Sequence, residues 1–117
     1  MREQDLHIAV ADYLAVALPA EAVFYHVPNG ELRNKAVAAK LVKMGVKAGV
    51  PDFALIHDGR ALFLEAKTDR GRLSVEQRIA HADLARAGGE VAVVRSVEDA
   101  VEVLASWGVP LRASVRA

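Results

Sequence analysis

The chain has 117 residues, 15 basic and 15 acidic residues, and no cysteine. A chain of this length holds one hydrophobic core, so we expect a single domain over residues 1–117. The lack of cysteine excludes a disulfide framework and a thiolate metal site, and the zero net charge argues against a protein that coats nucleic acid through its overall charge.

Helical and extended patterns alternate in the first part of the chain. Apolar residues recur at helical spacing over residues 3–18, and Pro19 ends the pattern. Residues 22–27 are rich in strand formers and precede a Pro-Asn-Gly turn signal, which predicts a strand. A second helix is expected over roughly residues 32–44, ended by Gly45.

A β-hairpin is predicted next, because residues 53–57 and 61–64 flank Asp58-Gly59, a strong signal for a tight turn. Ser74 can cap a third helix with Gln77 as its capping-box partner. A buried strand over 91–94 and a last helix over 96–107 follow, and the tail after residue 110 is expected to be disordered. This order predicts an α/β fold with a mixed β-sheet flanked by helices on both faces.

The hairpin register predicts which side chains meet across the two strands. Counting outward from the turn gives four opposed pairs: His57 with Arg60, Ile56 with Ala61, Ala54 with Phe63, and Asp52 with Glu65. Opposed residues share a face with Cβ atoms about 5 Å apart. Lys67, two residues beyond Glu65, falls on the same face.

Two opposed carboxylates destabilise a sheet, and a divalent cation would explain them. Magnesium is usually held by one or two carboxylates with water and substrate phosphate oxygens. An ammonium group beside such a site could orient water or stabilise charge on a phosphate. The alternative is that Asp52 is a turn residue and that Glu65 and Lys67 form a weak ion pair on an exposed strand.

The same residues carry a resemblance to a known family. Pro51-Asp52 followed by Glu65-Ala66-Lys67 is the PD-(D/E)xK pattern of a nuclease superfamily that includes restriction enzymes and junction resolvases. Three surrounding segments make the pattern more specific: His-Val-Pro-Asn-Gly at 26–30, Gly-Val-Lys-Ala-Gly-Val-Pro-Asp at 45–52, and Gly-Arg-Leu-Ser-Val-Glu-Gln at 71–77. Together they resemble a stand-alone VRR-NUC domain over nearly the whole chain.

The resemblance implies a restriction-endonuclease-like core and a phosphodiesterase that uses Mg²⁺ or Mn²⁺. Asp52 and Glu65 would be metal ligands, the carbonyl of Ala66 would add a third, and Lys67 would position or help deprotonate the attacking water. The resemblance also places an acidic residue on the first helix and a glutamine after the lysine strand. These two positions match Glu3, with Asp5 ranked second, and Gln77.

A purely structural role remains an alternative for both Gln77 and Glu3. Gln77 can be only a capping-box partner, and Glu3 can simply stabilise a helix N-terminus.

Four further residues are candidates for contact with substrate phosphates. Lys47 lies in a glycine-containing loop, where the backbone can approach a ligand closely. Arg70 and Arg72 follow the lysine strand and could reach a nucleic-acid backbone. His26 could touch a phosphate, or it could be a hydrogen-bonded structural histidine.

Other charged residues have weaker patterns. A basic run, which either holds phosphates or is a solvated helix face, comprises Arg33, Lys35, Lys40, Lys43 and Lys47. The remaining histidines, His7, His57 and His81, show no recognisable metal-ligand spacing.

These features predict a metal-dependent endonuclease that hydrolyses DNA, selective for junctions or flaps. The resemblance points to stand-alone bacterial or phage members, which are symmetric oligomers such as homodimers. The N-terminus lacks a signal-peptide pattern and no stretch could span a membrane, so a cytoplasmic location is expected. The alternatives are a DNA-binding module that does not cut and an interaction subunit with a chance motif.

Overall fold

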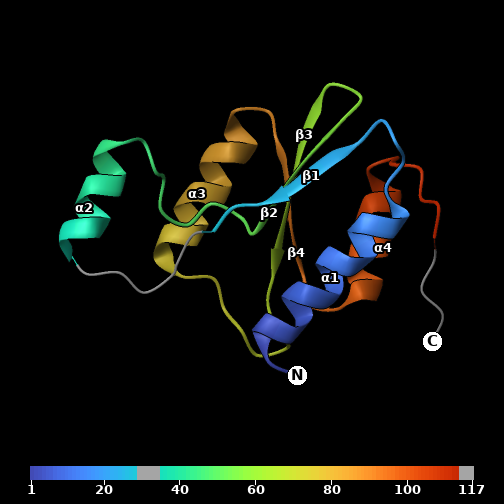
Figure 1. Ribbon diagram of the computed structural model, residues 1–117, viewed down its shortest axis with the longest axis horizontal. Coiled ribbons are helices and arrows are strands. Elements are labelled where there is room, and N and C mark those ends of the chain that lie inside the picture. Colours follow the sequence, from blue (N-terminus) through green and yellow to red (C-terminus); the bar gives the residue numbers. More distant parts are fainter. Residues whose placement is uncertain (29–34, 114–117) are drawn as a thin grey trace.

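The computed structural model describes residues 1–28 and 35–113. Its elements follow the predicted order of helix, strand, helix, hairpin, helix, strand, helix (Figure 1). They are α1 (Glu3–Ala17), β1 (Val23–His26), α2 (Lys35–Lys43), β2 (Phe53–His57), β3 (Arg60–Ala66), α3 (Val75–Arg86), β4 (Glu90–Val94) and α4 (Val97–Ser106).

The four strands form one mixed sheet in the order β1-β2-β3-β4. β1, β2 and β3 pair antiparallel, whereas β3 and β4 pair in parallel. Asp58 and Gly59 both have positive φ angles, 51° and 73°, as a two-residue type I′ turn requires. Because this turn sets the register, Ala54 pairs with Phe63 as the sequence predicts.

The core lies between one sheet face and the helices α1 and α4. Buried apolar residues of α1, β2, β3, β4 and α4 form one cluster, which includes Val10, Phe53, Leu64, Val94 and Leu104. In Figure 1, α3 lies on the opposite side of the sheet from α1 and α4. The predicted mixed sheet with helices on both faces is therefore confirmed.

Local sequence explains where α3 and α4 begin. Ser74 accepts a hydrogen bond from the backbone N–H of Gln77, and the Gln77 side chain accepts one from the backbone N–H of Ser74. This reciprocal pair is the predicted capping box. Ser96 caps α4 by accepting from the backbone N–H of Asp99.

Helix α2 lies apart from the rest of the fold. α2 projects away from the body (Figure 1), and none of its nine residues is buried. The predicted start of this helix at residue 32 lies outside the described residues.

After α4, the backbone N–H of Arg112 donates to the carbonyl of Ala17, and the hydroxyl of Tyr13 donates to the carbonyl of Ala113. The chain therefore packs on α1 up to Ala113.

No helix among the described residues is long and apolar enough to cross a membrane.

Candidate active site

The sequence-predicted carboxylates meet where β2 begins and β3 ends. Phe53 pairs with Leu64, so Asp52 and Glu65 lie one step further along the same ladder. Asp52 Oδ2 accepts a hydrogen bond from the backbone N–H of Ala66 at 2.8 Å, and the Asp52 carboxyl lies close enough to Glu65 to raise its pKa. The predicted register thus brings the two acids together.

Glu65 is buried, with 2% of its surface exposed. Two side chains of α3 contact its carboxyl group: Gln77 Nε2 donates to Oε2 at 3.4 Å, and His81 Nε2 lies 3.2 Å from Oε1. The alternative hypothesis, in which Glu65 lies on an exposed strand and forms only a weak ion pair, is therefore wrong. The strand continues into the packed interior because α3 covers this end of β3.

The environment of Glu65 favours its protonated form. Burial first, and then the charge and hydrogen bond of Asp52, raise the pKa of Glu65 to about 9. Burial also lowers the pKa of His81, so the contact between them at neutral pH is a hydrogen bond between uncharged groups. Two neighbouring carboxyls, of which Glu65 is buried and protonated, fit a divalent cation, which would take the place of the Glu65 proton.

Lys67 and Glu3 lie beside the carboxylates. Lys67 Nζ is 3.7 Å from Glu3 Oε1, and only 11% of the Lys67 side chain is exposed. The charges of both residues act on Glu65, Lys67 lowering its pKa and Glu3 raising it. Asp5, the second-ranked acid of α1, instead pairs with Arg2 at 3.5 Å on the exposed side of the helix. The structure therefore brings Glu3 to the site.

Gln77 makes both of the contacts that the sequence left as alternatives. Its Oε1 and backbone N–H complete the capping box with Ser74, while its Nε2 faces Glu65. One amide can do both because its oxygen accepts and its nitrogen donates. The cap thus positions the amide against the carboxyl group.

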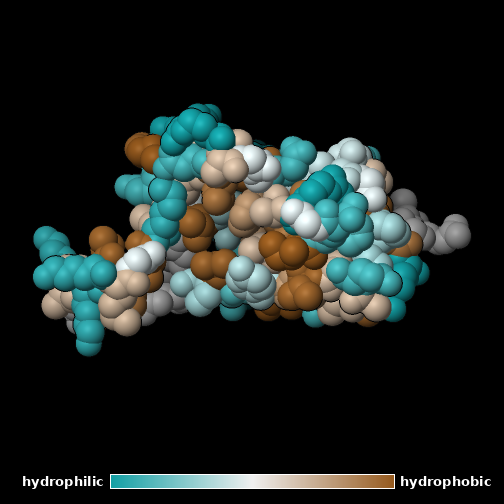
Figure 2. Space-filling model, turned by 90° about the horizontal axis from the view of Figure 1, so that it is seen from above, coloured by the Kyte–Doolittle hydropathy of each residue, from teal (hydrophilic) through white to brown (hydrophobic). Residues whose placement is uncertain are grey.

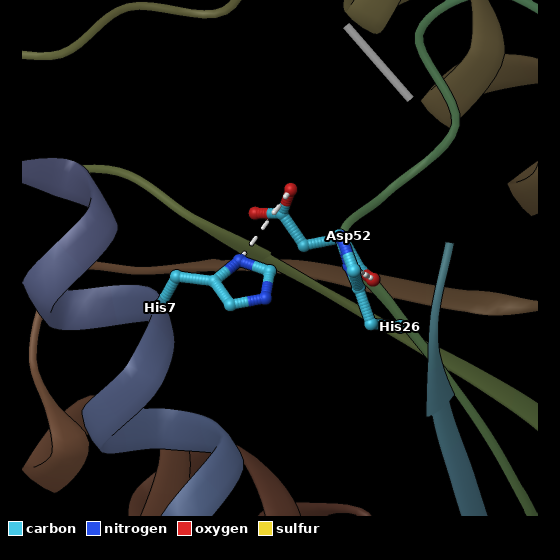
Figure 3. A group of neighbouring side chains, drawn as sticks. All are labelled: His7, His26 and Asp52. Atoms are coloured by element: carbon cyan, nitrogen blue, oxygen red, sulfur yellow. Dashed lines mark hydrogen bonds and ion pairs between the residues drawn. The ribbon is translucent and has the colours of Figure 1, made fainter. Parts of the chain in front are cut away.

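Two histidines, His7 and His26, lie beside Asp52 (Figure 3). His7, from α1, places Nδ1 4.0 Å from Asp52 Oδ1, and the Nδ1 of His26 lies 2.8 Å from the backbone carbonyl oxygen of Asp52. The two imidazole rings pack edge to face with centroids 4.4 Å apart. Burial lowers the pKa of His7, which favours an uncharged ring.

Sequence reasoning missed His7 and His81, although a signal for both was present. His7 follows Glu3 by four residues, and His81 follows Gln77 by four residues. Residues four apart share a helix face. Each histidine could therefore have been placed beside a predicted site residue once the helices were assigned.

The phosphate-binding candidates lie in different settings. Lys47 Nζ is 2.7 Å from Asp83 Oδ2 on α3, so this lysine is in an ion pair. Arg70 and Arg72 are exposed in the loop after Lys67. Arg95 holds this loop by donating to the carbonyls of Thr68 and Gly71 at 2.6 Å and 2.8 Å.

In the loop before Asp52, Gly49 packs against the backbone of α3 and does not face a space that a ligand could fill. A Cβ atom at Gly49 would lie 2.3 Å from the carbonyl oxygen of Glu76, at the start of α3. The close backbone approach that the sequence suggested for a ligand is thus used to dock this loop on α3. Arg33, from the basic run, lies outside the described residues.

The comparisons with known proteins agree with this geometry. A family model described as VRR-NUC domain matches residues 2–98. A solved structure named "VRR_NUC domain protein" has a TM-score of 0.72 at 21% identity, covering 92% of this chain and 88% of its own. Another solved structure, named "VRR_NUC domain", has a TM-score of 0.56 at 19% identity, covering 91% of this chain and 97% of its own.

At these identities the structural likeness shows the fold alone. No curated protein matches the sequence. The family model spans most of the chain, from the first turn of α1 to the start of α4. The protein therefore belongs to the VRR-NUC domain family of nucleases.

Proposed function

We propose that this protein is a metal-dependent endonuclease that hydrolyses phosphodiester bonds in DNA. The observation that carries the proposal is the pairing of Asp52 with buried Glu65, next to the ammonium group of Lys67. A buried carboxylate beside a second acid is costly unless a cation or a proton compensates its charge. The chain's membership of a nuclease family supports a catalytic cation at this pair.

Asp52 and Glu65 are the proposed ligands of Mg²⁺ or Mn²⁺, with the backbone carbonyl of Ala66 and the carboxylate of Glu3 completing the set. All four offer hard oxygen donors, the type both ions prefer. When bound, the cation supplies charge stabilisation to the phosphate and lowers the pKa of an attacking water. Gln77 and His81 hold the Glu65 carboxyl in place through their hydrogen bonds.

Lys67 is proposed to orient the attacking water and to help deprotonate it. Its side chain is 11% exposed, and Glu3 is its ion-pair partner at 3.7 Å. Packing thereby limits the positions of the ammonium group, which favours a defined geometry for its hydrogen bonds. Glu3 then has two proposed contacts, one to the cation and one to Lys67.

Arg70, Arg72, Lys47 and His26 are proposed to contact DNA phosphates. Such contacts hold the substrate in register without reading its sequence. Arg70 and Arg72 come directly from the loop that follows Lys67, which Arg95 fixes to the body. For Lys47, a phosphate would replace or share the present contact with Asp83.

The preferred substrate is proposed to be branched DNA such as a junction or a flap, cut by a homodimer. Two-fold symmetry places two active sites on two strands of a branched substrate. One sheet face offers a surface for self-association, because Val23 pairs with Ile56 and their side chains are 60% and 45% exposed.

Cleavage of a labelled panel of four-way junction, flap, duplex and single-stranded DNA tests the proposal. We expect wild type to cut branched DNA only when Mg²⁺ or Mn²⁺ is present, and Lys67→Ala to lose at least about 100-fold in rate. Arg60→Ala, which removes a cation at the other end of β3, is the matched control and should cut normally.

Two outcomes would replace this proposal by its alternatives. Binding of branched DNA by wild type without cutting under either metal would identify a binding module. No DNA binding at low salt would instead identify an interaction subunit, since phosphate contacts strengthen as salt falls.

A further inference from the structure

Three potential metal ligands converge beside the proposed catalytic pair. His7, His26 and Asp52 each offer a ligand atom, and these atoms lie within 4.8 Å of one another. They come from three separate elements: α1, the end of β1, and the segment just before β2. In Figure 3 a ring nitrogen of His7 faces the Asp52 carboxylate, and His26 lies beside the Asp52 backbone.

The hydrogen bond of His26 determines which of its nitrogens can bind a metal. A backbone carbonyl oxygen only accepts hydrogen bonds, so the 2.8 Å contact with Asp52 requires a proton on Nδ1 of His26. In the neutral ring Nε2 then carries the lone pair. Metal-binding histidines characteristically donate their other N–H to a carbonyl or carboxylate in this way, which fixes the tautomer and the ring orientation.

Packing holds His7 in the same region. Its ring contacts Phe53 with centroids 4.5 Å apart and meets His26 edge to face at 4.4 Å. Val10, one turn further along α1, is fully buried, so the helix itself is anchored in the core. Asp52 Oδ2 is occupied by the Ala66 N–H, whereas Oδ1 is the oxygen that faces His7.

We propose that His7, His26 and Asp52 form a second cation site, selective for a divalent transition metal such as Zn²⁺ or Co²⁺ over Mg²⁺. Two imidazole nitrogens with one carboxylate suit these ions, whereas Mg²⁺ takes oxygen ligands. Zinc bonds of about 2.0–2.2 Å would draw the three ligand atoms closer together than they lie in the structure. Three protein ligands leave a coordination position open.

The inference rests on the proposed function only in sharing Asp52 between the two sites. Asp52 can serve both sites, because its Oδ1 faces His7 while its carboxyl group also acts on Glu65. The phosphate contact proposed for His26 would then pass through the ion at its Nε2. The Glu65→Gln variant separates the sites, because it removes a carboxylate from the first and leaves the histidine site intact.

Zinc titration of the metal-free Glu65→Gln protein by calorimetry tests the proposal. We expect one equivalent to bind, and His7→Gln or His26→Gln added to this background to weaken the affinity by at least about tenfold. His57→Gln, which removes a histidine from the far end of β2, is the control and should bind zinc unchanged. Thermal melting verifies that each variant is folded.

A spectroscopic measurement on wild type avoids substitutions altogether. In long-range ¹H–¹⁵N spectra, zinc should shift the Nε2 resonance of His26 and a ring resonance of His7, while Nδ1 of His26 stays protonated and the His57 signals stay in place. Equal zinc affinity in the His7→Gln and His57→Gln proteins, or unshifted His7 and His26 signals, would overturn the proposal. DNA cleavage with Mg²⁺ is scored separately, so either proposal can fail alone.

Discussion

At the residue scale, Glu65 links the electrostatics of the site to protein stability. Its pKa is raised to about 9, by burial first, then by Asp52 and Glu3, with Lys67 acting in the opposite direction. Gln77 and His81 from α3 hydrogen-bond the same carboxyl. The unfolded chain releases this proton near pH 4.5, whereas the folded protein keeps it until about 9. The free energy of unfolding should therefore fall as pH rises between these values.

We predict that Glu65→Gln stabilises the metal-free protein by about 2 kcal/mol at pH 7, since the amide stays neutral. Urea unfolding in the presence of a chelator, from pH 4 to pH 9, measures the effect. The gain should vanish near pH 4, where the carboxyl is protonated in both states. A gain that is the same at every pH would contradict the raised pKa.

Metal binding should release a proton from the same group. Because Glu65 is protonated in the metal-free protein, a cation bound by this carboxylate must displace the proton. We expect Mn²⁺ affinity to rise with pH through the neutral range, and calorimetry in buffers of different ionisation enthalpy to show proton release. Asp52→Asn should reduce both the affinity for Mn²⁺ and the number of protons released. Binding without proton release would indicate that Glu65 is not a ligand.

Gln77 can be tested by separating its two contacts. Ser74→Ala removes the hydrogen bond that Ser74 Oγ accepts in the cap but leaves the Gln77 amide opposite Glu65. It should cost about 1 kcal/mol of stability with little loss of cleavage. Gln77→Ala removes both contacts, and should add a loss of at least about tenfold in kcat. Urea unfolding and single-turnover cleavage give the two quantities. Equal activity in the two variants would leave Gln77 with the capping role alone.

At the element scale, the loop from Gly45 to Asp52 is positioned by its docking on α3. Gly49 has φ +81°, and a Cβ there would lie 2.3 Å from the Glu76 carbonyl oxygen and 2.6 Å from the backbone nitrogen of Gln77. These are backbone atoms of the capped first turn of α3, which cannot give way easily. The same contact helps to place Asp52 against Glu65.

We predict that Gly49→Ala destabilises the protein by about 3 kcal/mol or more and impairs cleavage. Gly45→Ala is the matched control: its φ is +103°, but nothing lies within 4 Å of the added Cβ. That variant should show only backbone strain, about 1–2 kcal/mol. Chemical unfolding and cleavage compare the two, and equal effects would show that the contact with α3 is unimportant.

At the scale of the whole molecule, one sheet face stays partly uncovered. α3 covers the end near Glu65, but Val23, Tyr25 and Ile56 on β1 and β2 are all 45% exposed or more. A groove lined by Tyr25, Ala54, Phe63 and Leu84 continues this surface toward α2. In Figure 2, with α2 at the left, apolar side chains (brown) also reach the surface of the main body.

If the protein dimerises through this face, Ile56→Asp should shift it to a monomer. Ile8→Asp on α1 is the matched control, because Ile8 is 50% exposed and points away from the core. Sedimentation velocity at several concentrations reports the state of association. A dimer that persists in Ile56→Asp but dissociates in Ile8→Asp would place the interface on α1 instead.

The sequence by itself determined the elements, the hairpin register and the acidic pair. These depend on local rules: helical spacing, the Asp58-Gly59 turn and strand alternation place Asp52 opposite Glu65 without knowledge of the rest of the fold. The capping box likewise lies within four consecutive residues, Ser74 to Gln77.

Only the tertiary structure decided what surrounds those carboxylates. Glu65 is buried by residues that are distant from it in sequence. The contacts of His7 with Asp52, of His81 with Glu65 and of Lys47 with Asp83 also join residues that are far apart along the chain. They depend on how α1 and α3 pack on the sheet. A pattern of side chains along the chain shows which face each residue occupies, but the distance between two faces is set by packing across the whole domain.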